Sequence, residues 1–435
     1  MINRRQALVS SLFGAGAIGL RALATGLPVS FLMNPRQALA DTPAPACTNP
    51  KAQYIIFCTS GSGDPINANV PGTYDDPNIY HSQDPAMAAT ALTLRGQKTK
   101  AAAPWASLPQ NVLDRSQFWH VMTNTPVHPK QPEVMKLMHV TKGDDMLASI
   151  LARQLAPCLG TIQSQPISVG ATNPSEGLTY AGQALPVVPA LALKATLTNP
   201  TGPLTNLQPL RDQTLAQLYD VYKKDASKAQ KAYIDSLVTT QSQVRNINQN
   251  LLNSLASIKD NSAASQITAA LALIQMKVTP VISIHIPFGG DNHHDVALAG
   301  ETAQTVAGVA TIASLMSQLA SLGLQDQVSF MSLNVFGRTL GPASTDGRQH
   351  NPNHQVSIAI GKPFAGGVIG GIGPVAGDFG ALPIDSKTGK AGGDIAATST
   401  LASFGRTMLA GVGIDPAVIS GQILSGQVVG SAVLT

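Results

Sequence analysis

Charged side chains are scarce in this chain of 435 residues, and their scarcity argues against several classes of protein. Asp, Glu, Lys and Arg make up 12% of the sequence, about half the share of roughly 25% that is usual in soluble domains. The formal net charge is only +4. No basic stripe is interleaved with aromatic residues, so nucleic acid is not expected as a partner. Hydrophobic residues still amount to 44% and are spread along the chain, which predicts a large folded core.

Cysteine is also rare, with three residues at positions 47, 58 and 158. No Cys-x-x-Cys pair exists, so zinc-knuckle and thioredoxin-like signatures are absent. Cys58 lies in an apolar stretch typical of a strand, and we expect a buried thiol there. A disulfide between Cys47 and Cys158 is compatible with an oxidising compartment, but the sequence leaves this pairing open.

Only the start of the chain has a long apolar stretch, and it has the features of an export signal. Two adjacent arginines, Arg4 and Arg5, precede a mostly apolar segment that ends at the small-x-small site Ala38-Leu39-Ala40. We expect residues 1–40 to be a twin-arginine signal peptide, read by the twin-arginine translocase and removed on export to the periplasm or beyond. Arg21 leaves apolar pieces shorter than the roughly 20 residues of a spanning helix, so no stable membrane span is expected after cleavage.

Strand and helix patterns alternate along residues 41–435, which we interpret as a single α/β domain. The strand runs are continuously apolar rather than alternating, as in a mostly parallel sheet sandwiched by helices. A polar region with apolar residues at helical spacing, about 211–258, predicts a helical insertion. Residues 65–110 are expected to form long surface loops with a short helix or two. The expected strands cover 54–58, 116–122, 279–288, 326–337 and 355–361, and the expected helices 144–157, 262–278, 301–324 and 398–413.

Polar clusters follow the expected strands, at 60–64, 123–128, 289–295 and 336–354. In α/β sheets, ligand sites gather beyond the carboxyl ends of the strands. The clusters therefore predict one shared site. His128 lies in such a loop, whereas His120 falls inside the second strand pattern and is expected to be a packed residue.

The stretch HIPFGGDNHHDV, residues 285–296, raises two alternatives. Asp291 and His293 offer carboxylate and imidazole ligands that suit a divalent metal such as zinc. Further ligands would have to come from elsewhere, and the candidates are His350 and His354 in GRQHNPNH together with Asp64. The other interpretation is a polar turn with exposed histidines.

Arg338 follows the expected strand 326–337 and also has two interpretations. An arginine there can bind a phosphate, sulfate or carboxylate through two parallel hydrogen bonds. It can equally tie down backbone carbonyl groups or a neighbouring Asp. No Gly-x-Ser-x-Gly turn is present, which argues against a serine-hydrolase triad, and no nucleophile is marked by the sequence.

Several motifs, in order along the chain, resemble those of the bacterial family catalogued as domain of unknown function one-five-zero-one, whose members often carry twin-arginine leaders. The matching stretches are SGSGD ending at Asp64, GGDNH with Asp291 and His293, NVFGRT with Arg338, GRQH with His350, and FAGGVIGG at 364–371.

That family is similar to the alkaline phosphatase and sulfatase superfamily. The resemblance implies an α/β sandwich with metal ligands at strand ends. It implies Asp291 and His293 as ligands, with His350 and His354 completing the site. Arg338 would hold a small anionic substrate, and the implied activity is hydrolysis of phosphate or sulfate esters.

Three positions depart from the family pattern. Val335 stands where the family has Glu, Gln349 where it has Asp, and Gly290 where it has Trp. Two anionic ligands are therefore missing, so a one-metal site fits better than a two-metal site. The sequence leaves two functions open: a metal-dependent hydrolase, and a non-catalytic binding or assembly protein of the cell envelope on the same scaffold.

Overall fold

The computed structural model describes Cys47 and residues 49–170, 176–198, 249–288, 290–341 and 347–434, with isolated positions between 213 and 231. The expected leader, residues 1–40, lies outside the described residues. Most of the expected helical insertion 211–258 lies outside them too, and helix α11, Gln249–Ala256, is its main described part.

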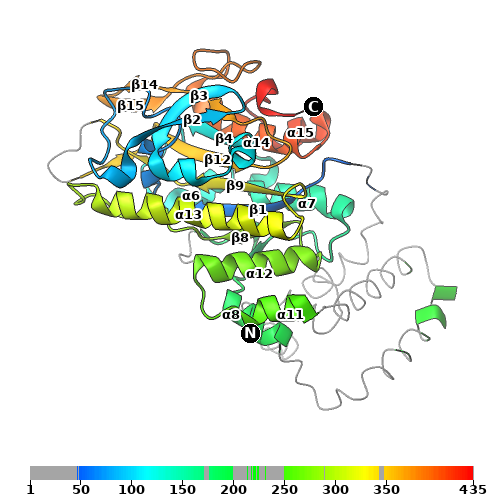
Figure 1. Cartoon of the computed structure of the whole chain (residues 1–435). Helices are drawn as coiled ribbons and strands as arrows, with labels where there is room; N and C mark the ends of the chain where they lie inside the picture. The colour runs from blue at the N-terminus through cyan, green and yellow to red at the C-terminus, as the bar shows by residue number, and fades with distance from the viewer. Residues whose placement is uncertain are drawn as a thin grey trace, which may run out of the picture.

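A seven-stranded sheet forms the centre of the described chain (Figure 1). Its strand order is β13-β4-β12-β9-β1-β8-β5. Strand β12 is antiparallel to both neighbours, and the remaining pairs are parallel. The predicted α/β class with a mostly parallel sheet is therefore confirmed. The strands are Tyr54–Ser60 (β1), Ser116–Val121 (β4), Ile167–Ser168 (β5), Val281–Ile284 (β8), Val328–Asn334 (β9), Gln355–Ile360 (β12) and Gly367–Ile369 (β13).

Both faces of this sheet are covered, as strand β1 shows. All seven of its residues are buried. Ile55 and Phe57 belong to one hydrophobic cluster, whereas Ile56 and Cys58 belong to the other. Because successive side chains of a strand point to opposite faces, each cluster lies on its own side of the sheet. This two-sided burial explains why successive residues of β1 are apolar instead of alternating with polar ones.

Helices supply the two covering layers. The cluster with Ile56 includes residues of α12 and α13, and the cluster with Ile55 includes residues of α7 and α14. Helices α8 and α11 pack with α12 beyond strand β8, as Figure 1 shows. The α-helices besides α11 are Gln110–Leu113 (α5), Gln131–Met135 (α6), Leu147–Leu159 (α7), Ala190–Thr198 (α8), Ala263–Gln275 (α12), Ala299–Ser321 (α13), Thr400–Gly411 (α14) and Pro416–Gln422 (α15).

One expectation for the fold is wrong. Residues 65–110 contain a regular antiparallel hairpin, β2 (Ala89–Leu94) and β3 (Gln97–Ala102), rather than loops and short helices alone. Its strands hold mostly Thr, Ala and Lys and bury only one face, so they lack the apolar run that marks a core strand. Smaller ribbons pair Thr179–Tyr180 (β6) with Gln183–Ala184 (β7), Gly337–Arg338 (β10) with His350–Asn351 (β11), and Ile372–Val375 (β14) with Asp378–Ala381 (β15).

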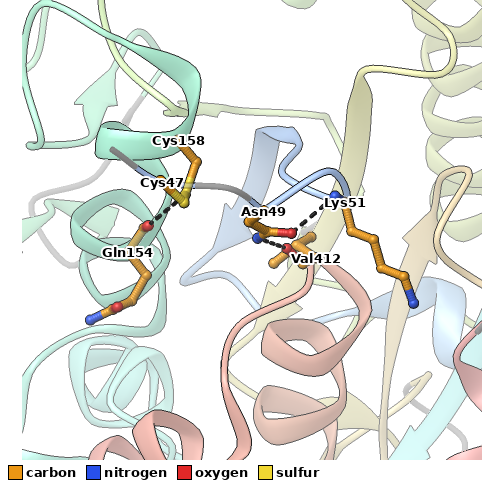
Figure 2. The surroundings of a disulfide bond; sticks show 6 residues. All are labelled: Cys47, Asn49, Lys51, Gln154, Cys158 and Val412. Atoms are coloured by element: carbon orange, nitrogen blue, oxygen red, sulfur yellow. Dashed lines mark hydrogen bonds between the residues drawn. A yellow bond between two sulfur atoms is a disulfide. The ribbon is translucent and has the colours of Figure 1, made fainter. Parts of the chain in front are cut away.

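A disulfide joins Cys47 to Cys158 on α7, across 111 residues of sequence (Figure 2). The amide of Asn49 donates to the carbonyl of Val412 at 2.8 Å, so the segment beside the disulfide is also fixed to the end of α14. Cys58 is free and buried, as predicted. Within the described residues, no helix is long and apolar enough to cross a membrane.

Candidate functional site

Three histidines meet at the edge of the sheet where β4 and β8 end. His128 follows β4, His293 follows β8, and His350 lies just before β12, whose reversed direction brings its amino end to the same edge. The Nε2 atoms of His293 and His350 are 2.9 Å apart. The ring of His128 stands edge-on to that of His350, with centroids 4.7 Å apart. The predicted convergence of polar loops at this edge is thus observed for these three side chains.

Backbone carbonyl groups orient two of these rings. His128 Nδ1 donates to the carbonyl of Gly61 at 2.7 Å, and His350 Nδ1 donates to that of Pro126 at 2.7 Å. In a neutral imidazole a proton on Nδ1 leaves a lone pair on Nε2. Hydrogen bonds of this kind orient the histidine ligands of metal sites. Both rings are therefore oriented in the way that the histidine ligands of metal sites are, with the lone pair on Nε2.

The contact between His293 and His350 lacks a satisfactory proton arrangement when both rings are neutral. His350 Nε2 carries a lone pair, so His293 Nε2 would have to donate to it. Arg338 Nη1, however, also faces His293 Nε2 at 3.3 Å, and Arg can only donate. One ring nitrogen cannot both accept from Arg338 and donate to His350. A cation shared by the two Nε2 atoms would resolve the contact between the rings, and it would displace the Arg338 Nη1 donor from His293 Nε2.

Burial favours the neutral form of His350. Burial lowers its pKa most, the hydrogen bond to the Pro126 carbonyl raises it, and the neighbouring Arg338, His128 and His293 lower it. Metal ligation requires a neutral imidazole. His350 is therefore in the ligating form at neutral pH.

Asp291 lies at the rim of the cluster. Its carboxylate accepts from the backbone N–H of His293 at 3.0 Å, and this bond lowers its pKa. The side chain is 74% exposed, and its Oδ1 is 3.9 Å from His293 Nε2. Asp291 thus provides the negative charge next to the histidines, but it does not bond to their rings.

Arg338 is completely buried and binds mainly to the backbone. Its Nη2 donates to the carbonyls of Ser62 at 3.0 Å and Gly290 at 2.9 Å. This is the backbone-tying role that the sequence left open for it. Only Nη1 is directed at the histidines, and Nε has no hydrogen-bond partner among the described residues.

Asp64 and His354 are placed apart from the three histidines. Asp64 is fully buried and caps the 3-10 helix η1, Pro65–Ala68, by accepting from the N–H of Ile66 at 3.1 Å. Burial raises its pKa to about 7. Both ring nitrogens of His354 are engaged, Nδ1 with Asn67 at 3.1 Å and Nε2 with His120 at 2.8 Å. Neither residue has a ligand atom directed at the histidine cluster.

Two residues next to the cluster gave no signal in the sequence. Glu176 is buried and accepts from the N–H of Gly61 at 3.1 Å, so the Gly61 peptide joins it to His128. Its other oxygen is 3.4 Å from His285 Nδ1. Glu176 follows the two-residue edge strand β5 and sits in a Pro/Ser-rich stretch, so only the folded chain reveals its burial. His285 follows β8 directly, and that position was its only marker.

Val335 and Gln349, which stand where the family pattern has acidic residues, add no negative charge to the site. Val335 is completely buried in the hydrophobic cluster of α7 and α14, and Gln349 is exposed. Among the described residues, no group of three or more His, Cys, Asp or Glu is arranged to hold a metal ion as it stands. His128, His293, His350 and Asp291 offer suitable donor types, but ligation would need small movements of their side chains.

No model of a known protein family matches the chain, and a search of the curated proteins finds no match either. The family resemblance therefore rests on the short motifs of the sequence and stays a prediction.

Proposed function

We propose that the protein is an exported, metal-dependent hydrolase of phosphate or sulfate esters, on a scaffold of the alkaline phosphatase and sulfatase kind. The observation that supports this most strongly is the contact between His293 Nε2 and His350 Nε2 at 2.9 Å, beside Arg338. The two Nε2 atoms are close enough to bind one divalent cation, and Arg338 Nη1 would have to leave the His293 lone pair for the cation to bind.

The proposed ligands are His293 and His350, with His128 and Asp291 completing the site. His354 is left out because it is fully buried and its ring bonds to Asn67 and His120, away from the three histidines. When bound, a divalent ion would supply an activated water and stabilise charge on a transferred phosphoryl or sulfuryl group. Arg338 would add positive charge for an anionic substrate, with Nη1 turned away from the His293 lone pair that binds the metal.

The first test is metal content by mass spectrometry on protein exported through its own leader. Wild type is expected to contain one divalent metal ion per chain, and His293→Ala is expected to lose it. His294→Ala is the matched control, because His294 is adjacent but exposed and should not affect the metal. Metal-loaded protein would then be assayed on aryl phosphates, phosphodiesters and sulfates. An absence of metal in the wild type would refute the proposal.

The second candidate is a non-catalytic envelope protein that uses the same scaffold for binding or assembly. Val335 and Gln349 support it, because the two acidic side chains of the family pattern are missing. Metal that is lost in His293→Ala, without hydrolysis of any ester class, would favour this second function.

A further inference from the structure

One buried carboxylate, that of Glu301, lies behind the histidine cluster and receives hydrogen bonds from three separate segments. Glu301 belongs to the first turn of α13, and its side chain is 0% exposed. Arg348 donates to it through Nε at 2.7 Å and Nη2 at 3.2 Å. Asn292 donates at 3.1 Å and Asn69 at 2.8 Å. Each carboxylate oxygen of Glu301 therefore accepts two hydrogen bonds.

Two of these donors are close in sequence to the site histidines. Asn292 precedes His293, and Arg348 is two residues before His350. The Arg348 side chain is itself fully buried, and its remaining N–H groups donate to the carbonyls of Thr339 and Tyr80. Glu301 thus joins the loop after β8, through Asn292, to the loop before β12, through Arg348.

The backbones of the two loops also touch. The N–H of Arg348 donates to the carbonyl of Asn292 at 3.1 Å. Gly347 has φ +99°, and a Cβ added there would lie 2.4 Å from the Asn292 carbonyl oxygen. Only glycine allows this approach. The two loops are fixed against each other directly below the contact between His293 and His350.

We infer that Glu301 is a positioning residue: through Asn292 and Arg348 it sets the separation of His293 and His350 and so preorganises the ligand-binding site. This inference rests on the proposed metal site for its functional meaning. A purely structural ion pair would stabilise the fold without affecting ligand affinity in particular. Positioning instead predicts that the affinity falls more than the stability accounts for, because second-sphere groups commonly change metal affinity by roughly tenfold or more.

The test compares Glu301→Gln with the double variant Glu301→Gln/Arg348→Met, both in the full mature chain. The single variant leaves the Arg348 charge buried and unpaired, which risks unfolding. The double variant removes both charges and is the decisive one. The matched control is Arg115→Met/Asp326→Asn, which removes an ion pair with a 2.6 Å contact between groups outside the two loops.

Cobalt(II) titration followed by visible absorption measures affinity, and hydrogen exchange measures the order of residues 290–297 and 347–354. The double variant is expected to bind Co²⁺ at least tenfold more weakly and to exchange faster in both loops, with the control unchanged. Wild-type affinity and loop protection in a folded double variant would overturn the inference.

The two proposals fail in different ways. If wild type binds no Co²⁺, the proposed metal site fails, and the exchange measurement alone decides the positioning role. Faster exchange confined to the two loops then supports that role, and unchanged exchange refutes it.

Discussion

Histidine residues of this chain have two different roles, and burial separates them. His354 and His120 are fully buried and form a hydrogen-bonded chain from Asn67 to the carbonyl of Pro71. Asn67 Nδ2 donates to His354, so His354 donates to His120, and His120 donates to Pro71. Both rings are neutral in this arrangement. The site histidines His128, His293 and His350, by contrast, are partly exposed.

This buried pair gives the fold a dependence on pH. Burial lowers the pKa of His120 to about 4 and that of His354 well below its usual value. Between about pH 6.5 and pH 4 the unfolded chain takes up protons that the folded chain does not. The contribution of this histidine pair to the free energy of unfolding is therefore fully present above pH 6.5 and is lost as the pH falls. Asp64 has the opposite effect on the pH dependence. Because its pKa is raised, the folded chain holds a proton that the unfolded chain loses, and stability falls as the pH rises toward 7.

The change that tests this is His120→Gln, followed by denaturant unfolding at pH 7.5 and pH 4.5. We expect the variant to be less stable at pH 7.5, because a buried ring is lost. Its loss of stability between the two pH values should be about 2–3 kcal/mol smaller than that of wild type. An equal loss in both proteins would mean that His120 carries no part of the pH dependence.

For the histidine side chains, the sequence predicted which edge of the sheet they lie at better than it predicted what each ring does. Loop histidines after strands were expected at a common edge, and His293, His350 and His128 are found there. His354 shares a loop with His350, yet its ring turns into the core toward His120. A four-residue spacing in a loop does not determine side-chain direction, because no regular period applies there. Only the folded backbone separates the two residues.

At the scale of elements, the close packing of α13 on the loop after β8 depends on a small residue. A Cβ added to Gly308 in the middle of α13 would lie 2.1 Å from Cε1 of Phe288. Gly421, near the end of α15, has no atom within 4 Å of such a Cβ. The two helical glycines are therefore a matched pair, one required by packing and one free to change.

Alanine at each position should change stability in opposite directions. Gly308→Ala is expected to lower the free energy of unfolding by about 1–3 kcal/mol, because Phe288 must move. Gly421→Ala is expected to raise it by about 0.5 kcal/mol through the better helix propensity of alanine. Thermal and denaturant unfolding of both variants measure the difference, and equal effects would contradict the packing argument.

The sequence predicted those elements best that are buried on both sides. Strands β1, β9 and β12 were expected close to their observed bounds, because each is rich in apolar residues. The edge strand β5 has two residues and β13 has three, too few to give a pattern. The hairpin of β2 and β3 was missed for a different reason, since its Thr- and Lys-rich outer face masks the alternation.

On the scale of the whole molecule, the disulfide links Cys47, which precedes β1, to Cys158 in α7. Closing a loop of 111 residues removes conformational freedom mainly from the unfolded chain. Cys47→Ser is therefore expected to lower the free energy of unfolding by about 2–4 kcal/mol. Reductant should have the same effect on wild type and on Cys58→Ala, in which the free thiol is removed, but no effect on Cys47→Ser. A wild-type protein insensitive to reductant would contradict this.

The described ends of the chain lie at the edge of the sheet away from the histidines. The disulfide and Asn49 precede β1, whose amino end is there, and Lys51 Nζ donates to the carbonyl of Leu434 at 3.3 Å. The seven residues of β1 separate this edge from the site by roughly 20 Å. A surface attached beside Cys47 or Leu434 would therefore leave the histidine cluster facing outward. Immobilisation at either position should leave the loops after β8 and before β12 open to the surrounding solution.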